Sequence, residues 1–181
     1  LAAGVPTADC TLDLGRSSAT VAVGEPGWTH EGRHYPWITN CRDRTIYHWD
    51  GDDFAPVSRF SGSLIKLVPT DWGPPTFEID GIKMLVTAKL SPWEDARRKV
   101  GLVEPRGKVI LDTCGGLGYF AAWCLAGGAF RVLSWEKNPD VLWLRSLNPW
   151  SPEGSGANCS GLELTRGDSS AAIAALPADS V

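Results

Sequence analysis

The sequence of 181 residues lacks several features, and each absence excludes a class of protein. No apolar run approaches the length of a membrane-spanning helix, and no signal peptide is visible, so we expect a cytoplasmic protein with no membrane partner. There is no excess of positive charge: 17 basic residues face 21 acidic ones. This balance gives no basic field for nonspecific nucleic-acid binding, although it leaves an RNA substrate open. With 43% hydrophobic residues, the chain has enough apolar side chains to bury a core.

Paired metal-binding cysteines are also missing. The five cysteines are scattered, odd in number and without a C-x-x-C pair, which favours reduced thiols over disulfides or zinc ligands. Residues 30–34 read H-E-G-R-H and match the H-E-x-x-H pattern of zinc proteases. That chemistry needs a helix, whereas Pro26, Gly27, Gly32 and Pro36 predict a turn. We therefore expect no metal site.

Residues 1–88 predict a small β-rich N-terminal domain, because short apolar and β-branched runs alternate with Gly, Pro and Asp. Two dipeptides, Asp50-Gly51 and Asp80-Gly81, are typical of hairpin turns. The candidate strands are Thr11–Leu14, Ala19–Val23, Thr45–Trp49, Val57–Phe60, Leu64–Val68, Thr76–Ile79 and Ile82–Val86.

The stretch from Lys108 to Glu136 predicts the first unit of a nucleotide-binding α/β domain. It contains a buried strand, a turn of small residues, an alanine-rich helix closed by two glycines, a second strand and an acid. In order these are Val109–Leu111, Cys114–Gly118, Tyr119–Ala126, Phe130–Trp135 and Glu136.

Further elements extend this unit into a partial Rossmann-like domain over residues 89–181. A capping Ser91 followed by Pro92 and Glu94 predicts a helix that carries Arg97, Arg98 and Lys99 toward its end and on its solvated face. Later elements are a helix that starts at Asn138-Pro139 and stops at Asn148-Pro149, a loop over Ser151–Ser160 and a third strand at Leu162–Thr165. We expect Trp150, just after that helix, to pack against the protein. A helix over Ala171–Leu176, capped by Ser169 and Ser170, follows.

The chemistry of the glycine turn favours an adenosine-type ligand at the carboxyl ends of the strands. Glycines let the backbone approach a ligand closely, and the next helix begins with free N–H groups. Glu136 ends the second strand, where its carboxylate can accept both hydroxyl hydrogens of a ribose. Residues 116–121 also fit G-x-G-x-x-G/A, which keeps a nicotinamide-dependent oxidoreductase open, although Asp112 and Asp168 argue against it.

The frame Asp112-x-x-x-Gly116-x-Gly118, with Glu136 further on, resembles motifs I and II of the class I S-adenosylmethionine (SAM) methyltransferases. Their first motif reads D-x-G-x-G-x-G, and Cys114 replaces its first glycine here. The wider combination resembles a largely uncharacterised prokaryotic family of SAM-dependent methyltransferases with a small N-terminal β region. The segments that carry it are LDTCGGLGY (111–119), EKNP (136–139), LNPWS (147–151) and GD (167–168).

This resemblance implies SAM as cofactor and assigns roles to residues. Asp112 faces the methionine part, Glu136 the ribose and Asp168 the adenine amino group. The implied cofactor site is completed by Cys114, Gly115, Gly116, Gly118, Lys137 and Ser169. Catalytic residues and the methyl acceptor, a small molecule or RNA, stay unassigned. An aminopropyl transferase on a similar fold and an inactive fragment or binding module remain alternatives.

Family members continue into a fourth strand with an Asp-Pro-Pro motif, whereas this sequence stops at Val181. We therefore expect a C-terminally truncated α/β chain holding strands 3-2-1 of a class I sheet, inactive in methyl transfer by itself. Without the later strands, the strand Val109–Leu111 has one unpaired edge. That edge predicts a homo-oligomer.

Overall fold

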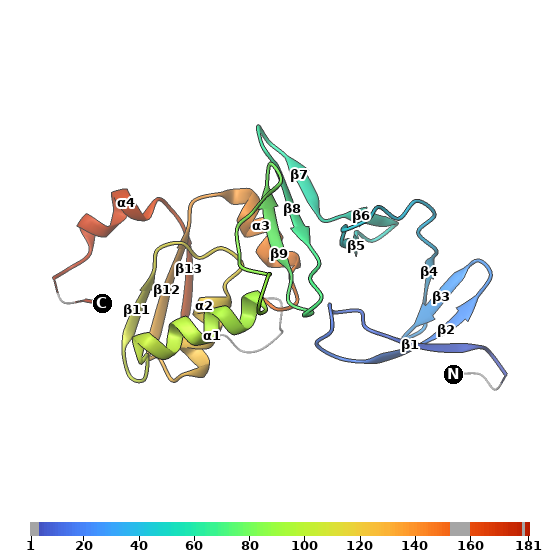
Figure 1. Ribbon diagram of the computed structural model, residues 1–181, viewed down its shortest axis with the longest axis horizontal. Coiled ribbons are helices and arrows are strands. Elements are labelled where there is room, and N and C mark those ends of the chain that lie inside the picture. The colour runs from blue at the N-terminus through green and yellow to red at the C-terminus, as the bar shows by residue number, and fades with distance from the viewer. Residues whose placement is uncertain (1–3, 153–159, 179) are drawn as a thin grey trace.

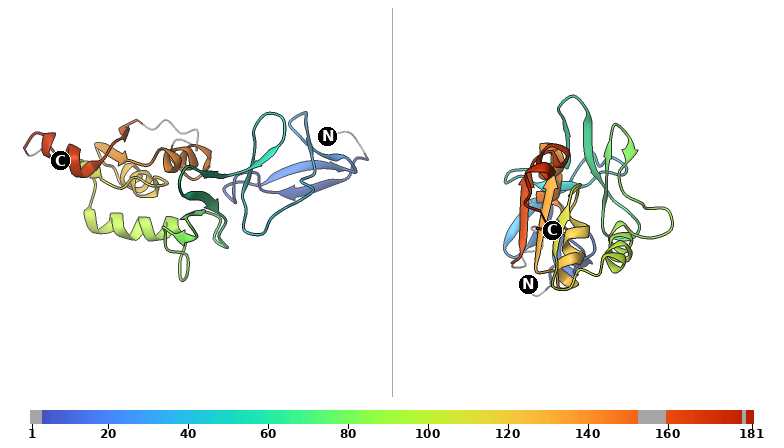
Figure 2. Two further views of the ribbon diagram at one scale, coloured as in Figure 1. Left: turned by 90° about the horizontal axis from the view of Figure 1, so that it is seen from above. Right: turned by 90° about the vertical axis from the view of Figure 1, so that its left-hand side faces the viewer.

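The computed structural model describes residues 4–152, 160–178, 180 and 181. A four-stranded antiparallel sheet, β1–β4, lies at one end of an elongated molecule, and a parallel sheet, β11–β13, lies at the other (Figure 1). The antiparallel strands β7–β9 lie between them, as the view from above also shows (Figure 2). Within the described ranges, no helix is long and apolar enough to cross a membrane.

The first sheet is a meander of β1 (Thr7–Cys10), β2 (Ala19–Gly24), β3 (Gly27–His30) and β4 (Arg33–Pro36). The expected turn at residues 31 and 32 is confirmed, since this pair joins β3 to β4 with positive φ at both positions. The expected strand at Thr11–Leu14 is wrong. There the Asp13 carboxylate accepts hydrogen bonds from the backbone N–H groups of Arg16 and Ser17. Such local bonds between a side chain and the nearby backbone stabilise a turn in place of a strand.

Two further hairpins complete the β-rich region. Strands β5 (Tyr47–Trp49) and β6 (Phe54–Pro56) meet at the expected Asp50 turn, where Asp50 Oδ1 accepts the N–H groups of Asp52 and Asp53. A second four-stranded sheet contains β7 (Ser58–Phe60), β8 (Leu64–Val68), β9 (Thr76–Ile79) and β10 (Ile82–Lys83). The β8 and β9 predictions are confirmed to the residue. The strands expected at Thr45, Val57 and Ile82 are shorter than predicted.

The second half of the chain alternates helices and parallel strands. In order they are α1 (Pro92–Val103), β11 (Val109–Asp112), α2 (Tyr119–Ala126), β12 (Arg131–Glu136), α3 (Pro139–Leu147), β13 (Leu162–Arg166) and α4 (Ser169–Ala172), followed by a 3-10 turn over Ile173–Ala175. Strand β12 lies between β11 and β13, the order expected for the first three strands of the sheet.

Several element ends in this half differ from the predictions. Strand β12 runs from Arg131 to Glu136, one residue later at each end than the predicted strand. Helix α4 is capped by Asp168, not by a serine, since Asp168 Oδ1 accepts the Ser170 N–H at 2.9 Å. The three basic residues expected at the end of α1 lie in its middle, where their ion pairs reach back to Glu94 and Asp95. The predicted loop at 151–160 falls mostly outside the described residues.

A hydrophobic cluster joins the β7–β10 sheet to the helices of the second half. It contains Ile65, Leu67 and Phe77 from the sheet, together with Tyr119 and Leu144 from α2 and α3. The predicted domain boundary after residue 88 therefore has core residues of this one cluster on both sides, and the division into two domains stays a prediction. This packing fixes the β7–β8 hairpin near the carboxyl ends of the parallel strands.

Candidate functional site

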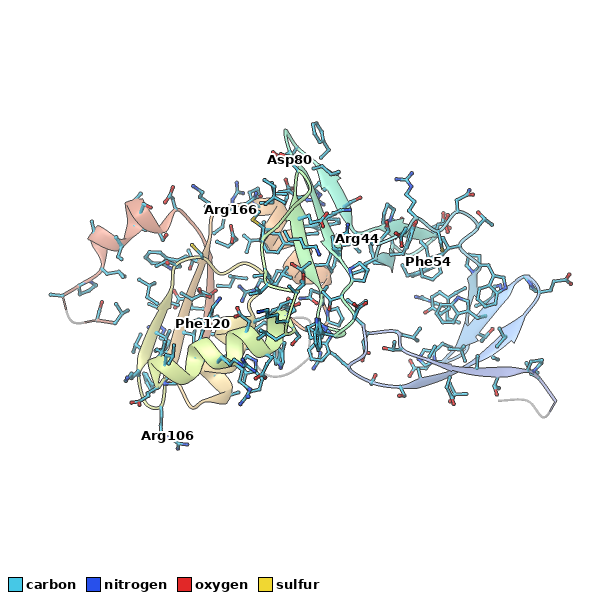
Figure 3. The ribbon with its side chains drawn as sticks, in the orientation of Figure 1. Arg44, Phe54, Asp80, Arg106, Phe120 and Arg166 are labelled. Atoms are coloured by element: carbon cyan, nitrogen blue, oxygen red, sulfur yellow. The ribbon has the colours of Figure 1, made fainter. Side chains whose placement is uncertain are left out.

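The candidate site is built from the loops that follow the three parallel strands. Because the strands are parallel, their carboxyl ends meet at one edge of the sheet, marked in Figure 3 by Arg166, the last residue of β13. Two adjoining cavities lie there, with volumes of about 240 and 200 Å3, and Cys114 lines both. The larger is also lined by Asp112, Gly115, Gly116 and Gly118, and the smaller by Glu136, Lys137, Asp168 and Ser169.

The structure therefore brings all nine predicted cofactor-binding residues to the walls of two neighbouring cavities. These residues lie up to 57 positions apart in sequence, from 112 to 169.

Glu136 ties the glycine loop to the end of β12. Its Oε2 accepts the Gly116 N–H at 3.0 Å, and its Oε1 accepts the Asn138 N–H at 2.8 Å. A carboxylate offers about four acceptor positions, so two remain for hydroxyl groups of a ligand. The half-buried acid is thus held in a fixed orientation beside the loop.

Asp112 is buried beneath the same loop, where Ser134 Oγ donates a hydrogen bond to its Oδ2 at 2.9 Å. Burial raises the pKa of this carboxyl, while the Ser134 hydroxyl and the positive charge of Arg145 act in the opposite direction. Asp112 therefore lies where it can both support the glycine loop and contact a ligand in the cavity that it lines.

Arg145 was missed by the sequence analysis. Its side chain is only 1% exposed, and Nη1 lies 3.2 Å from Ser134 Oγ and 3.5 Å from the Gly115 carbonyl oxygen. A Cβ atom on Gly115 would lie 2.6 Å from Ser134 Oγ, which explains the glycine. One signal for Arg145 existed in the sequence: it follows Val141 by four positions on the buried face of α3.

The Asn148-Pro149-Trp150-Ser151 segment anchors the other side of the loop. Asn148 Nδ2 donates to the Tyr119 hydroxyl at 3.1 Å and to Ser151 Oγ at 2.9 Å. Ser151 Oγ in turn donates to the Leu117 carbonyl oxygen at 2.8 Å. The expected helix end at Asn148 and the packing of Trp150 are confirmed, because Trp150 joins the core and its indole N–H bonds the Leu14 carbonyl.

The segments after the second and third parallel strands supply charge at the outer end of the site. Lys137 Nζ lies 3.7 Å from Asp168 Oδ2, with both side chains exposed. The Ser170 backbone N–H, and next the charge of Lys137, lower the pKa of Asp168. A wider cavity of about 890 Å3 continues from these two residues to the β7–β8 hairpin, whose Ser61 hydroxyl donates to Asp140.

A parallel sheet with a glycine loop after its first strand and an acid after its second defines an α/β fold of the Rossmann-like class. No family model matches the chain. An uncharacterized protein of Methanocaldococcus jannaschii is 45% identical over 105 residues, which are 58% of this chain and 35% of that protein. The chain thus spans about a third of the length of this relative.

Among solved structures, the match to spermidine synthase from Thermotoga maritima covers 76% of this chain and 52% of the synthase chain, with a TM-score of 0.50 and 16% identity. At that identity the likeness shows the fold alone. The tRNA m1G37 methyltransferase of M. jannaschii covers 69% of this chain and 35% of its own at 12% identity, but its TM-score of 0.35 is too low to carry an argument.

Proposed function

We propose that this chain carries the SAM-binding portion of a SAM-dependent methyltransferase. The observation that carries the proposal is the Glu136 carboxylate, fixed by the Gly116 and Asn138 N–H groups at the carboxyl edge of a parallel sheet with free acceptor positions. An acid so placed suits the two hydroxyl groups of a ribose. The methyl acceptor, a small molecule or RNA, is left open.

The residues present fit SAM in three parts. Asp112 and the N–H groups of the glycine loop would hold the methionine part, Glu136 the ribose, and Asp168 the adenine amino group. SAM, when bound, supplies an electrophilic methyl group. The chain's own residues bind and orient the cofactor, with Arg145 and Asn148 keeping the loop in position.

The proposal predicts a specific loss of affinity when Glu136 is changed. Glu136→Ala should weaken binding of S-adenosylhomocysteine roughly 30- to 150-fold, which corresponds to about 2–3 kcal/mol for a charge-assisted pair of hydrogen bonds. Calorimetry with the 181-residue chain would measure it, with urea unfolding as a check on stability. Glu163→Ala, an exposed acid on the neighbouring strand, is the matched control.

Three outcomes separate the alternatives. Equal losses in Glu136→Ala and Glu163→Ala would sink the ribose assignment. Tighter binding of NAD than of S-adenosylhomocysteine would favour an oxidoreductase. A preference for decarboxylated SAM over SAM would favour an aminopropyl transferase. This chain is similar in fold to one such enzyme, spermidine synthase.

A further inference from the structure

A buried carboxylate, that of Asp140, lies beside the candidate site without lining either of its two cavities. Asp140 belongs to the first turn of α3, and its side chain is only 9% exposed. An acid at this end of a helix interacts favourably with the helix dipole even when water surrounds it. Burial is different, because a carboxylate removed from water needs charged or hydrogen-bonding partners. The partners of Asp140 therefore indicate what its burial achieves.

Among the described residues, both side chains that bond the Asp140 carboxylate come from the β7–β8 hairpin. Ser61, in the turn of the hairpin, donates from Oγ to Oδ2, and Arg59 Nη1 lies 3.4 Å from Oδ1. The Arg59 guanidinium also lies over the Trp143 ring, 4.0 Å from its centroid. Trp143 follows Asp140 by three positions, so both lie on one face of α3. The first turns of α3 thus hold the hairpin by a charge, a hydrogen bond and a ring.

A continuous series of hydrogen bonds leads from Asp140 to the glycine loop. The Asp140 N–H donates to Asn138 Oδ1 at 2.9 Å, and the Asn138 N–H donates to Glu136 Oε1 at 2.8 Å. The other carboxylate oxygen of Glu136 accepts the Gly116 N–H. The cavity of about 890 Å3 between the hairpin and the start of α3 also shares three lining residues with the smaller cavity of the candidate site. The hairpin is therefore connected to the acid that ends β12.

We propose that Asp140 is a positioning residue of the cofactor site. By holding the β7–β8 hairpin against the start of α3, it fixes Asn138 and, through Asn138, the orientation of the Glu136 carboxylate toward a ribose. The inference rests on the proposed function. It gives the hairpin a part in cofactor binding, although its described residues, 58–68, line neither cavity of the candidate site. Asp140 acts through Asn138 and Glu136 and makes no contact with the cofactor.

The test compares two serines of the same turn by calorimetry with S-adenosylhomocysteine and the whole chain. Ser61→Ala removes a bond to Asp140 and should weaken binding about 2- to 10-fold. Ser63→Ala is the matched control and should leave the affinity unchanged. Ser63 lines the same wide cavity, but its hydroxyl bonds Asp80, which Figure 3 labels at the far end of the hairpin sheet from the helices.

Two substitutions of Asp140 provide a conservative rescue. Asp140→Asn removes the charge that attracts Arg59 but keeps an oxygen that accepts the Ser61 hydroxyl. Asp140→Ala removes both interactions. Since each variant loses the same charge from the start of α3, the difference between them reports the bond to Ser61. Asp140→Ala should therefore bind S-adenosylhomocysteine about 2- to 10-fold more weakly than Asp140→Asn.

Amide hydrogen exchange without ligand provides a second measurement. The amides of residues 138–142 should exchange faster in Ser61→Ala than in Ser63→Ala, while those of β12 stay protected in both variants. A purely structural role of Asp140 would change this exchange and leave the affinity for S-adenosylhomocysteine as it was. Equal affinities in the two serine variants, or in the two Asp140 variants, would therefore overturn the proposal. If the unaltered chain binds no S-adenosylhomocysteine at all, the proposed function itself fails, and this inference fails with it.

Discussion

The guanidinium group of Arg145 lies directly against Gly118, so closely that a Cβ atom at position 118 would be 2.7 Å from Arg145 Cζ. Arg145 is buried to 1% exposure by the packing of α3, and its side chain has no room to move aside. Gly118 also has a φ of +79°, which L residues with a Cβ adopt at a cost. The glycine at this position thus has a structural explanation in addition to any contact with a ligand.

This contact predicts the effect of Gly118→Ala on stability. The left-handed backbone alone should cost about 1–2 kcal/mol, and overlap with Arg145 should add about 1–3 kcal/mol. Gly107→Ala isolates the first effect, because Gly107 has a φ of +72° with open space around it. Urea unfolding of both variants measures the difference. Equal losses would mean that the loop moves away from Arg145 freely.

Cys114 should be protected from alkylation by SAM. The thiol is exposed and lines both cavities of the candidate site. A bound ligand would cover it, so its reaction with iodoacetamide should slow at least several-fold when SAM saturates the chain. Cys41 is exposed in the N-terminal half and serves as the control within the same sample. Mass spectrometry of the labelled peptides gives both rates. Unchanged labelling of Cys114 would exclude it from the site.

Burial should keep Cys124 unreactive in that experiment. It is fully buried, and burial raises the pKa of its thiol to about 11. Since the thiolate is the reacting form, labelling of Cys124 at neutral pH would report unfolding of α2 and not chemistry at the site.

Glu94 should make the stability of the chain depend on acid pH. Hydrogen bonds from Arg97, and next from Arg98, lower the pKa of this carboxyl from 4.5 to about 2. Between these values the unfolded chain binds more protons than the folded one, so stability present above pH 4.5 is lost as the pH falls toward 2. The free energy of unfolding, measured by urea titration at several pH values, should therefore fall less steeply between pH 4.5 and 2 in Glu94→Gln. Glu25→Gln, in an exposed turn, should leave this pH dependence unchanged. An unchanged slope in Glu94→Gln would contradict the ion pairs.

The edge of β11 should mediate self-association. Within the described residues β11 pairs with β12 alone, and its sequence Val-Ile-Leu-Asp is mostly apolar. An unpaired apolar edge is a template for a second chain, whereas the opposite edge strand, β13, carries Glu163 and Arg166. Leu111→Lys should therefore shift the chain toward monomer in light scattering. Leu164→Lys on β13 should not, and a monomeric unaltered chain would refute this prediction.

The sequence alone determined the helices and parallel strands of the second half, with their order, and several strands of the first half. The apolar runs at Val109 and Leu64 made strands because β-branched and apolar residues suit buried ladders, and Ser91 capped its helix as its hydroxyl predicts. Asp13 shows the limit of such patterns, because its carboxylate bonds its own backbone where the pattern predicted a strand. The strands β1, β3, β4 and β6 were missed for a related reason: each is short, and its pairing depends on a partner strand.

Tertiary structure alone decided what lies around the glycine loop and which aromatic rings of the N-terminal half meet. Nothing near Gly118 in the sequence places Arg145 against it; α3 does so by packing on the sheet. Asn148 and Tyr119 likewise meet only because α3 ends beside the start of α2. The rings of Tyr35 and Trp49 meet edge-on at 5.1 Å although Tyr35 belongs to the β1–β4 sheet and Trp49 to the β5–β6 hairpin. A sequence pattern reports contacts within a few residues, whereas burial and hydrogen bonding over long separations are set by the folded chain as a whole.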